Sequence, residues 1–164
     1  MPLVKTALVN GLRKFMDAQY SSFDKFPQTA NDAINDLIDA VDDYASNITP
    51  MSTTADAAKS AMGTILMNMN MGDYNKAIDA IQKGFTQYVT TLAGGMLTLT
   101  TGATIISNTL PQGNIPIDDV GNIGLNGGSS EDVANAIGTI ADTWFKTGIS
   151  TGTLNGVTST EPWL

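Results

Sequence analysis

The chain has 164 residues, of which 42% are hydrophobic and only 15% charged, and its net charge is −8. This length is enough for one domain with its own hydrophobic core. A strongly acidic chain repels phosphate backbones, so we expect no nucleic-acid partner. The chain contains neither His nor Cys. This excludes disulfides and thiolate metal sites, and it removes the commonest general base.

The opening stretch, MPLVKTALVNGLRKF, carries scattered basic residues and lacks a long apolar core, so no signal peptide is predicted. No later run approaches the roughly 18 apolar residues of a membrane-spanning helix, and we expect no membrane contact. The low charge is accompanied by many Thr, Ser, Asn and Gly residues. Such a composition favours a protein that packs beside other protein subunits.

Two amphipathic helices are predicted first, over residues 3–20 and 29–48, and the connector between them carries Phe23 and Phe26. The second helix is the clearest signal in the chain. Thr29 or Asn31 can cap its start, and Thr49-Pro50 is expected to end it. Its apolar positions recur three and four residues apart, as one helix face requires. They are Ala30, Ile34, Leu37, Ile38, Val41, Tyr44, Ala45 and Ile48.

Two further helices follow, over residues 54–69 and 74–93. The hydroxyl residues Ser52, Thr53 and Thr54 are available to cap the first of these. Gly94-Gly95 is expected to end the second, because glycine is the usual residue just past a helix. Four helices with short connections predict an antiparallel bundle over residues 1–95.

Residues 96–130 are rich in glycine and contain no basic residue. The piece MLTLTTGATII alternates weakly, which predicts one strand, and the remainder to residue 130 is typical of extended chain and turns. Its apolar residues are too regular for a flexible linker, so we expect them to lie against the bundle or against a neighbouring subunit. With the two C-terminal residues they form the predicted protein interface. This set is Leu110, Ile115, Ile117, Val120, Ile123, Leu125, Trp163 and Leu164.

A fifth helix is predicted over residues 131–148, with Ser129 or Ser130 as its cap. In the tail, residues 149–164, Asn155-Gly156 favours a two-residue hairpin turn. Trp163-Leu164 is expected to be docked on the core. The predicted fold is therefore mainly α. It is a single domain with an antiparallel bundle of four to five helices, an extended apolar loop region and a small C-terminal β-hairpin.

The sequence predicts no catalytic, cofactor-binding or metal-binding residues. Asp32, Asp36, Asp39 and Asp43 recur at helical spacing opposite an apolar stripe, which is typical of a solvated helix face. The glycines of residues 121–128 match no phosphate-binding motif, and the acids around them match no calcium loop. No serine lies in a nucleophile elbow. We therefore expect no enzyme, no cofactor and no small-molecule substrate.

The chain also resembles a known group of proteins. The segments ALVNGLRKFMDAQYSSFDKFPQTANDAINDLIDAVDDYA, FTQYVTTLAGGM and IADTWFKTGISTGTLNGV are similar to small virion structural proteins of T4-like tailed bacteriophages. The resemblance spans most of the chain. It implies a non-enzymatic component of a virion, assembled in the host cytoplasm, whose partners are other virion proteins and copies of itself. It does not distinguish capsid decoration from a neck, tail or baseplate position.

A second hypothesis follows from the charge pattern. The acidic second helix predicts a soluble binding module, such as an adaptor or inhibitor, that acts through its helical surface. Both hypotheses place function in protein–protein contact, but they place it on different parts of the chain.

Overall fold

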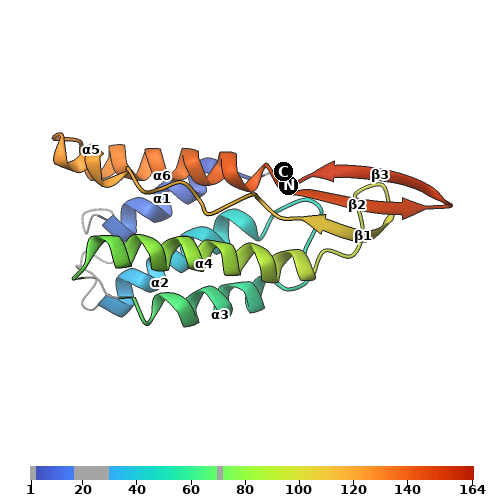
Figure 1. Cartoon of the computed structure of the whole chain (residues 1–164), viewed down its shortest axis with the longest axis horizontal. Helices are drawn as coiled ribbons and strands as arrows, with labels where there is room; N and C mark the ends of the chain where they lie inside the picture. The colour runs from blue at the N-terminus through green and yellow to red at the C-terminus, as the bar shows by residue number, and fades with distance from the viewer. Residues whose placement is uncertain (1–2, 17–29, 70–71) are drawn as a thin grey trace.

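The computed structural model describes residues 3–16, 30–69 and 72–164. Within them lie six helices and three strands. The elements are α1 (Lys5–Met16), α2 (Ala30–Ala45), α3 (Ala55–Leu66), α4 (Tyr74–Gly94), β1 (Thr104–Thr109), α5 (Gly121–Leu125), α6 (Ser130–Phe145), β2 (Ile149–Leu154) and β3 (Val157–Pro162). The helices lie lengthwise side by side, and the sheet extends from one end of them (Figure 1).

The mainly helical class and the small C-terminal sheet are confirmed. Helix α1 packs on α2 and α6, and α3 packs on α2 and α4. The predicted connector with Phe23 and Phe26, and the end of the predicted first helix, fall outside the described residues. Within those residues, no helix combines the length and apolar character needed to cross a bilayer.

Aromatic side chains occupy the centre of the helical core. The ring of Phe145 makes edge-on contacts with Tyr44, Phe85, Tyr88 and Trp144, at centroid distances of 5.3 to 6.5 Å. Such edge-to-face pairs contribute beyond the area that they bury. These rings come from α2, α4 and α6, so one cluster joins three helices.

Both tyrosine hydroxyls in this cluster donate to aspartates. Tyr44 donates to Asp142 Oδ1 at 2.7 Å, and Tyr88 donates to Asp42 Oδ1 at 2.9 Å. Burial, together with the facing carboxylate, raises the pKa of each tyrosine well above its ordinary value. The hydroxyls therefore stay neutral donors, and each ties its helix to a neighbouring one.

The hydroxyl residues that were predicted to cap α3 have a different role. Thr54 makes no side-chain cap bond to α3. Instead, Thr54 Oγ1 donates to the carbonyl of Thr91 at 2.7 Å, and Ser52 Oγ donates to that of Leu92 at 2.6 Å. They bind carbonyl groups in the last turn of α4, which lack the usual i+4 partner within the helix. The carbonyl of Leu92 also accepts from the N–H of Gly95 at 3.1 Å. Thr54 does occupy the N-cap position of α3, but its side chain does not make the cap bond. Local sequence does not show which other helix end will lie nearby and take these hydroxyls.

The contact between the start of α3 and the end of α4 also explains why a glycine, Gly95, follows α4. Its φ of −96° is not in the left-handed region, so the usual conformational argument for a glycine at this position does not apply. A Cβ on Gly95 would overlap the hydroxyl groups of Ser52 and Thr54. Glycine is therefore needed here for close approach between the start of α3 and the end of α4.

The segment after α4 differs from its prediction in two ways. The strand begins eight residues later than expected, at Thr104, because Leu97–Gly102 first makes a tight turn in which Leu99 N–H donates to the carbonyl of Ala103 at 2.8 Å. In addition, Gly121–Leu125 forms the short helix α5, where only turns were predicted. Two glycines in five residues give almost no intrinsic helix signal.

The C-terminal hairpin is confirmed. Asn155 and Gly156 both have positive φ, 51° and 78°, as the two central residues of a type I′ turn require. Leu154 faces Val157 across this turn. Strand β1 adds to the other side of β2, which gives the antiparallel order β1-β2-β3.

A chain of buried and part-buried hydrogen bonds attaches the sheet to the helices. Trp163 Nε1 donates to Ser150 Oγ at 3.0 Å, and Ser150 Oγ donates to Asn108 Oδ1 at 2.6 Å. Asn108 Nδ2 then donates to the carbonyl of Ala93, near the end of α4, at 2.8 Å. We call this chain the anchor relay. Trp163 and Ser150 are both fully buried, which confirms that the tail is docked.

We predict that Ser150→Ala lowers the free energy of unfolding by about 1–3 kcal/mol, because it leaves the Trp163 N–H and the Asn108 carbonyl group buried without partners. Urea denaturation followed by tryptophan fluorescence measures this loss. Ser107→Ala, at an exposed position of β1, is the control and should cost less than about 0.5 kcal/mol. Equal losses in the two variants would contradict the role of the anchor relay.

Candidate functional site

The predicted interface residues divide into buried and exposed groups. Ile115, Ile117, Val120 and Trp163 are at most 6% exposed and belong to the chain's own core. Gln82 on α4 holds this segment by donating from Nε2 to the carbonyl of Ile115 at 3.0 Å. These side chains contact their own helices and are not available to a partner in this structure.

The remaining residues of that set lie nearer the surface but do not form one patch. Leu110 and Ile123 are half-buried, whereas Leu125 is 85% exposed and Leu164 is 45% exposed. Leu125 belongs to α5, and Leu164 lies beside Thr49, with which it exchanges two backbone hydrogen bonds of 2.9 and 3.1 Å. The structure therefore does not bring the predicted interface together as a single surface.

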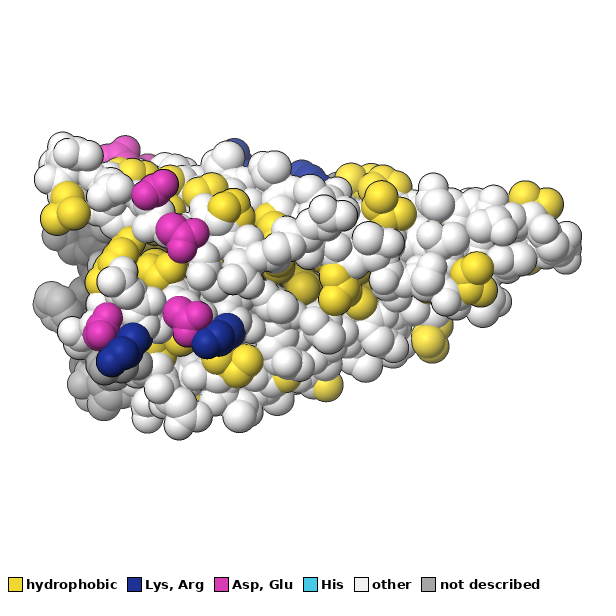
Figure 2. Space-filling model, viewed as in Figure 1, with side chains coloured by type: hydrophobic (Ala, Val, Ile, Leu, Met, Phe, Trp, Pro, Cys, Tyr) yellow, Lys and Arg dark blue, Asp and Glu magenta, His cyan; other side chains and the backbone are white. Residues whose placement is uncertain are grey.

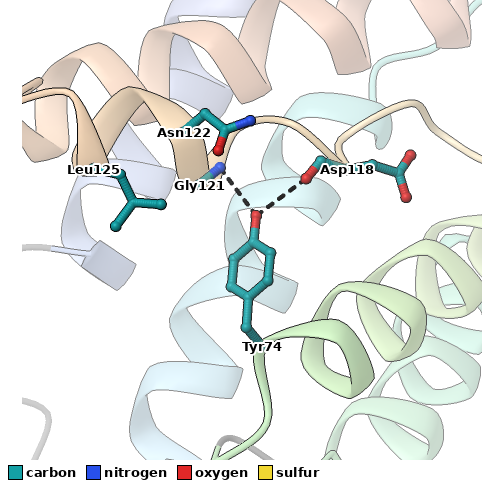
Figure 3. A pocket seen from close by; sticks show the side chains of 5 residues that line it. All are labelled: Tyr74, Asp118, Gly121, Asn122 and Leu125. Carbon is teal, nitrogen blue, oxygen red and sulfur yellow. Dashed lines mark hydrogen bonds between the residues drawn. The ribbon is translucent and has the colours of Figure 1, made fainter.

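Leu125 lines an open pocket of about 460 Å³ with Tyr74, Asp118, Gly121 and Asn122 (Figure 3). The Tyr74 hydroxyl donates to the carbonyl of Asp118 at 3.2 Å and accepts from the N–H of Gly121 at 3.0 Å. A side chain at position 121 would overlap the Tyr74 ring. These bonds join the start of α4 to α5, so the polar groups that line the pocket serve the fold.

A more extensive surface is found on the sheet. In an antiparallel ladder, residues that face each other point to the same side of the sheet. The pairs Thr104–Thr153, Ser107–Thr151 and Thr109–Ile149 join β1 to β2, and Thr153–Thr158, Thr151–Thr160 and Ile149–Pro162 join β2 to β3. We call the side that these residues share the threonine face. It comprises Thr104, Ser107, Thr109, Ile149, Thr151, Thr153, Thr158, Thr160 and Pro162.

The opposite side of the sheet is partly covered by the chain itself, although Leu154 and Val157, beside the hairpin turn, are 47% and 68% exposed. Leu99 lies against Gly152, where a Cβ would be only 3.0 Å from its side chain. The Glu161 carboxylate accepts from the backbone N–H and the hydroxyl of Thr100, at 2.9 and 2.8 Å. This carboxylate is the one charged group of residues 147–164, and it lies on the covered side.

The threonine face itself carries no charged residue. Its members on β1 and β3 are exposed, Ile149 is 40% exposed, and Thr151 and Thr153 are half-buried. Figure 2 shows the same division of the molecule on the side it displays: acidic and basic side chains lie over the helices, and the narrow end formed by the sheet shows none. An uncharged face of this kind is better suited to bind an uncharged protein surface than to bind a charged ligand.

The sequence contained a signal for this surface that the interface prediction did not use. Thr151, Thr153, Thr158 and Thr160 alternate on both sides of the Asn155-Gly156 turn. Once the hairpin is predicted, this period of two places all four side chains on one face. The contribution of β1 had no comparable signal, because its register to β2 shifts between Ile105 and Ser107.

The acidic row of α2 is partly neutralised within the chain. Lys59 Nζ on α3 lies 2.7 Å from Asp39 and 3.7 Å from Asp42, and the hydrogen bond to Asp39 raises the pKa of Lys59. Burial and the neighbouring Asp39 raise the pKa of Asp36. In the part of the chain that the structure describes, no cluster of three or more acidic residues could hold a metal ion.

Comparison with known proteins adds no relative. No protein-family model, no curated protein and no solved structure matches this chain.

We predict that Asp36→Asn stabilises the protein at neutral pH. Because the folded-state pKa of Asp36 is raised, its ionised form opposes folding above the unfolded-state pKa, and this cost disappears as the pH falls below the ordinary value of 3.8. Urea denaturation at pH 7 and below this value measures the difference. A gain that persists equally at low pH would contradict this explanation.

Asp132→Asn is the matched variant, for which we expect the opposite change in stability at neutral pH. Hydrogen bonds from the backbone N–H and hydroxyl of Ser129 lower the pKa of Asp132. The stability that this carboxylate contributes is present above the unfolded-state pKa and is lost as the pH falls through the lowered one. The substitution should therefore destabilise at neutral pH and have no effect in acid.

Proposed function

We propose that this chain is a non-enzymatic structural component of a bacteriophage virion and that it binds neighbouring virion subunits through the threonine face. In this proposal the helices, arranged as an antiparallel bundle, are the rigid body. The sheet is the part that contacts the partner subunit.

The observation that carries the proposal is an exposed, uncharged sheet face that is held rigidly to the helical core. Each threonine offers a methyl group and a hydroxyl, so the face can both bury apolar area and form hydrogen bonds. β-branched side chains have few χ1 rotamers to lose, and those on a sheet stand in a regular array. Ordering such a surface against a partner therefore costs little conformational entropy.

The charge distribution favours this face over α2 as the contact surface. Two of the α2 aspartates, Asp39 and Asp42, already interact with Lys59, so a basic partner that binds these two would have to displace an internal cation. A partner that binds the threonine face has no ion pair to displace. The resemblance of the sequence to virion structural proteins of T4-like phages supports placing the assembly in a virion.

We predict that Thr153→Lys and Thr109→Lys each prevent incorporation into particles, because each places an unpaired charge in an interface that offers no opposite charge. Particles grown with the variant as the sole source of the protein would be purified, and its copy number determined by quantitative mass spectrometry. Ser46→Lys, at an exposed position just after α2, is the control and should be incorporated normally.

Near-ultraviolet circular dichroism would establish that each variant is folded. Folded variants present in particles at the wild-type copy number would exclude the threonine face as the contact surface. Absence of the wild-type chain from purified particles would overturn the virion proposal itself.

A further inference from the structure

Strand β3 is an edge strand whose outer side is unpaired in the described part of the chain, where β2 is its one neighbour. The other edge of the sheet is different. β1 has an irregularity between Ile105 and Ser107, and Ile105 N–H donates to the carbonyl of Leu97 at 2.8 Å. The two edges therefore differ in how open they are to another strand.

The backbone groups that face outward from β3 can be assigned. Trp163 N–H donates to the carbonyl of Gly148 at 2.9 Å, so it points inward, toward β2. Backbone groups alternate along an antiparallel strand. The N–H and C=O groups of Thr158 and Thr160 therefore point outward, and so does the nitrogen of Pro162. The proline lies where its missing N–H costs no bond within the sheet.

Natural edge strands are usually protected by lysines, bulges or inward-pointing charges. β3 pairs with β2 without any shift in register, and its one charged residue, Glu161, is bound by Thr100 on the covered side. Its remaining residues before Pro162 are Val, Thr and Ser, of which Val and Thr have high strand propensity. Pro162 is a further protective feature, but it lies at the end of the strand. Residues 157–161 thus have the features of a strand that is ready to pair.

We propose that β3 pairs antiparallel with β3 of a second copy of this chain, about a two-fold axis at Ser159. The two sheets then form one continuous sheet across the interface. This inference deepens the proposed function by naming one partner of the assembly. It concerns the strand edge, whereas the contacts with other subunits use the threonine face.

The register about Ser159 satisfies the outward groups of both copies. Thr158 lies opposite Thr160 of the second copy, and Thr160 opposite Thr158, so both residues donate and accept backbone hydrogen bonds across the interface. These threonines also form cross-strand pairs on the threonine face, which are favourable. Glu161 lies opposite Val157 of the second copy, so no like charges meet.

Charge explains why the occupant is a second copy. The chain carries a net charge of −8, and apart from Glu161 residues 147–164 contribute none of it. Two acidic copies therefore meet with least repulsion at their sheet ends, which extend beyond the helices (Figure 1). A basic peptide would find no carboxylate on the outer edge of β3 to bind.

The first test is the mass of the purified full chain by sedimentation velocity over a range of concentrations. We expect a monomer–dimer equilibrium in the wild type. Thr160→Pro removes an outward N–H and should raise the dimer dissociation constant about tenfold or more. Thr160→Val keeps that N–H and a β-branched side chain, and should leave the dimer intact. A monomeric wild type, or a dimer that Thr160→Pro does not weaken, would overturn the proposal.

The second test examines the register and does not depend on proline. A variant carrying both Thr158→Lys and Thr160→Lys places like charges opposite each other in the dimer, as does one carrying both Thr158→Glu and Thr160→Glu. Each should be monomeric alone, and a mixture of the two should form heterodimers, detected by native mass spectrometry. Failure to form heterodimers while both variants remain folded would exclude this register.

Hydrogen exchange separates this inference from the proposed function. In the isolated chain, the amides of Thr158 and Thr160 should become protected as concentration rises. Protection that appears only after another protein is added would assign the edge to that protein and overturn self-pairing. A chain that is strictly monomeric but is incorporated into particles would overturn self-pairing and leave the virion proposal standing. A chain that dimerises but is absent from particles would overturn the virion proposal and leave self-pairing standing.

Discussion

The position of the sheet depends on how Trp163 is held. Its indole lies fully buried against Gly148, where any side chain would overlap the ring, and its N–H begins the anchor relay through Ser150 and Asn108 to the end of α4. These hydrogen bonds, together with the packing of the indole, restrict how the sheet can lie relative to the helices. A surface on the sheet is thereby held to the helical core.

The second organising feature is the separation of charge from the sheet. The ion pairs among described residues lie on the helices or next to their ends. Two sets join different helices: Arg13 with Glu131, and Lys59 with Asp39 and Asp42. The others lie within one helix or at its end: Lys76 with Asp73, Lys83 with Asp79, and Lys146 with Asp142. The sheet retains one carboxylate, and the chain's own Thr100 binds it on the covered side. Most of the charge thus lies at the helical end, while a neutral face and a regular strand edge lie at the other end.

The apolar residues of the 96–130 segment show a limit of reasoning from composition. Ile115 and Ile117 are apolar residues in extended chain, and both a core and an interface need such residues. The structure places them in the core, where Gln82 holds the segment against α4. An extended segment has no helical period to show which of its faces is covered, so the sequence could not distinguish the two outcomes.

The sequence by itself determined the helices α1 to α4 and α6, the hairpin and the buried tail. Each of these depends on local pattern: an apolar stripe at helical spacing, an Asn-Gly turn, an aromatic residue beside the last strand. Only the tertiary structure decided that Ser52 and Thr54 bind the end of α4, that β1 joins the hairpin, and that the threonine face is left exposed. These features arise where segments distant in sequence meet, and no local preference encodes which segments those will be.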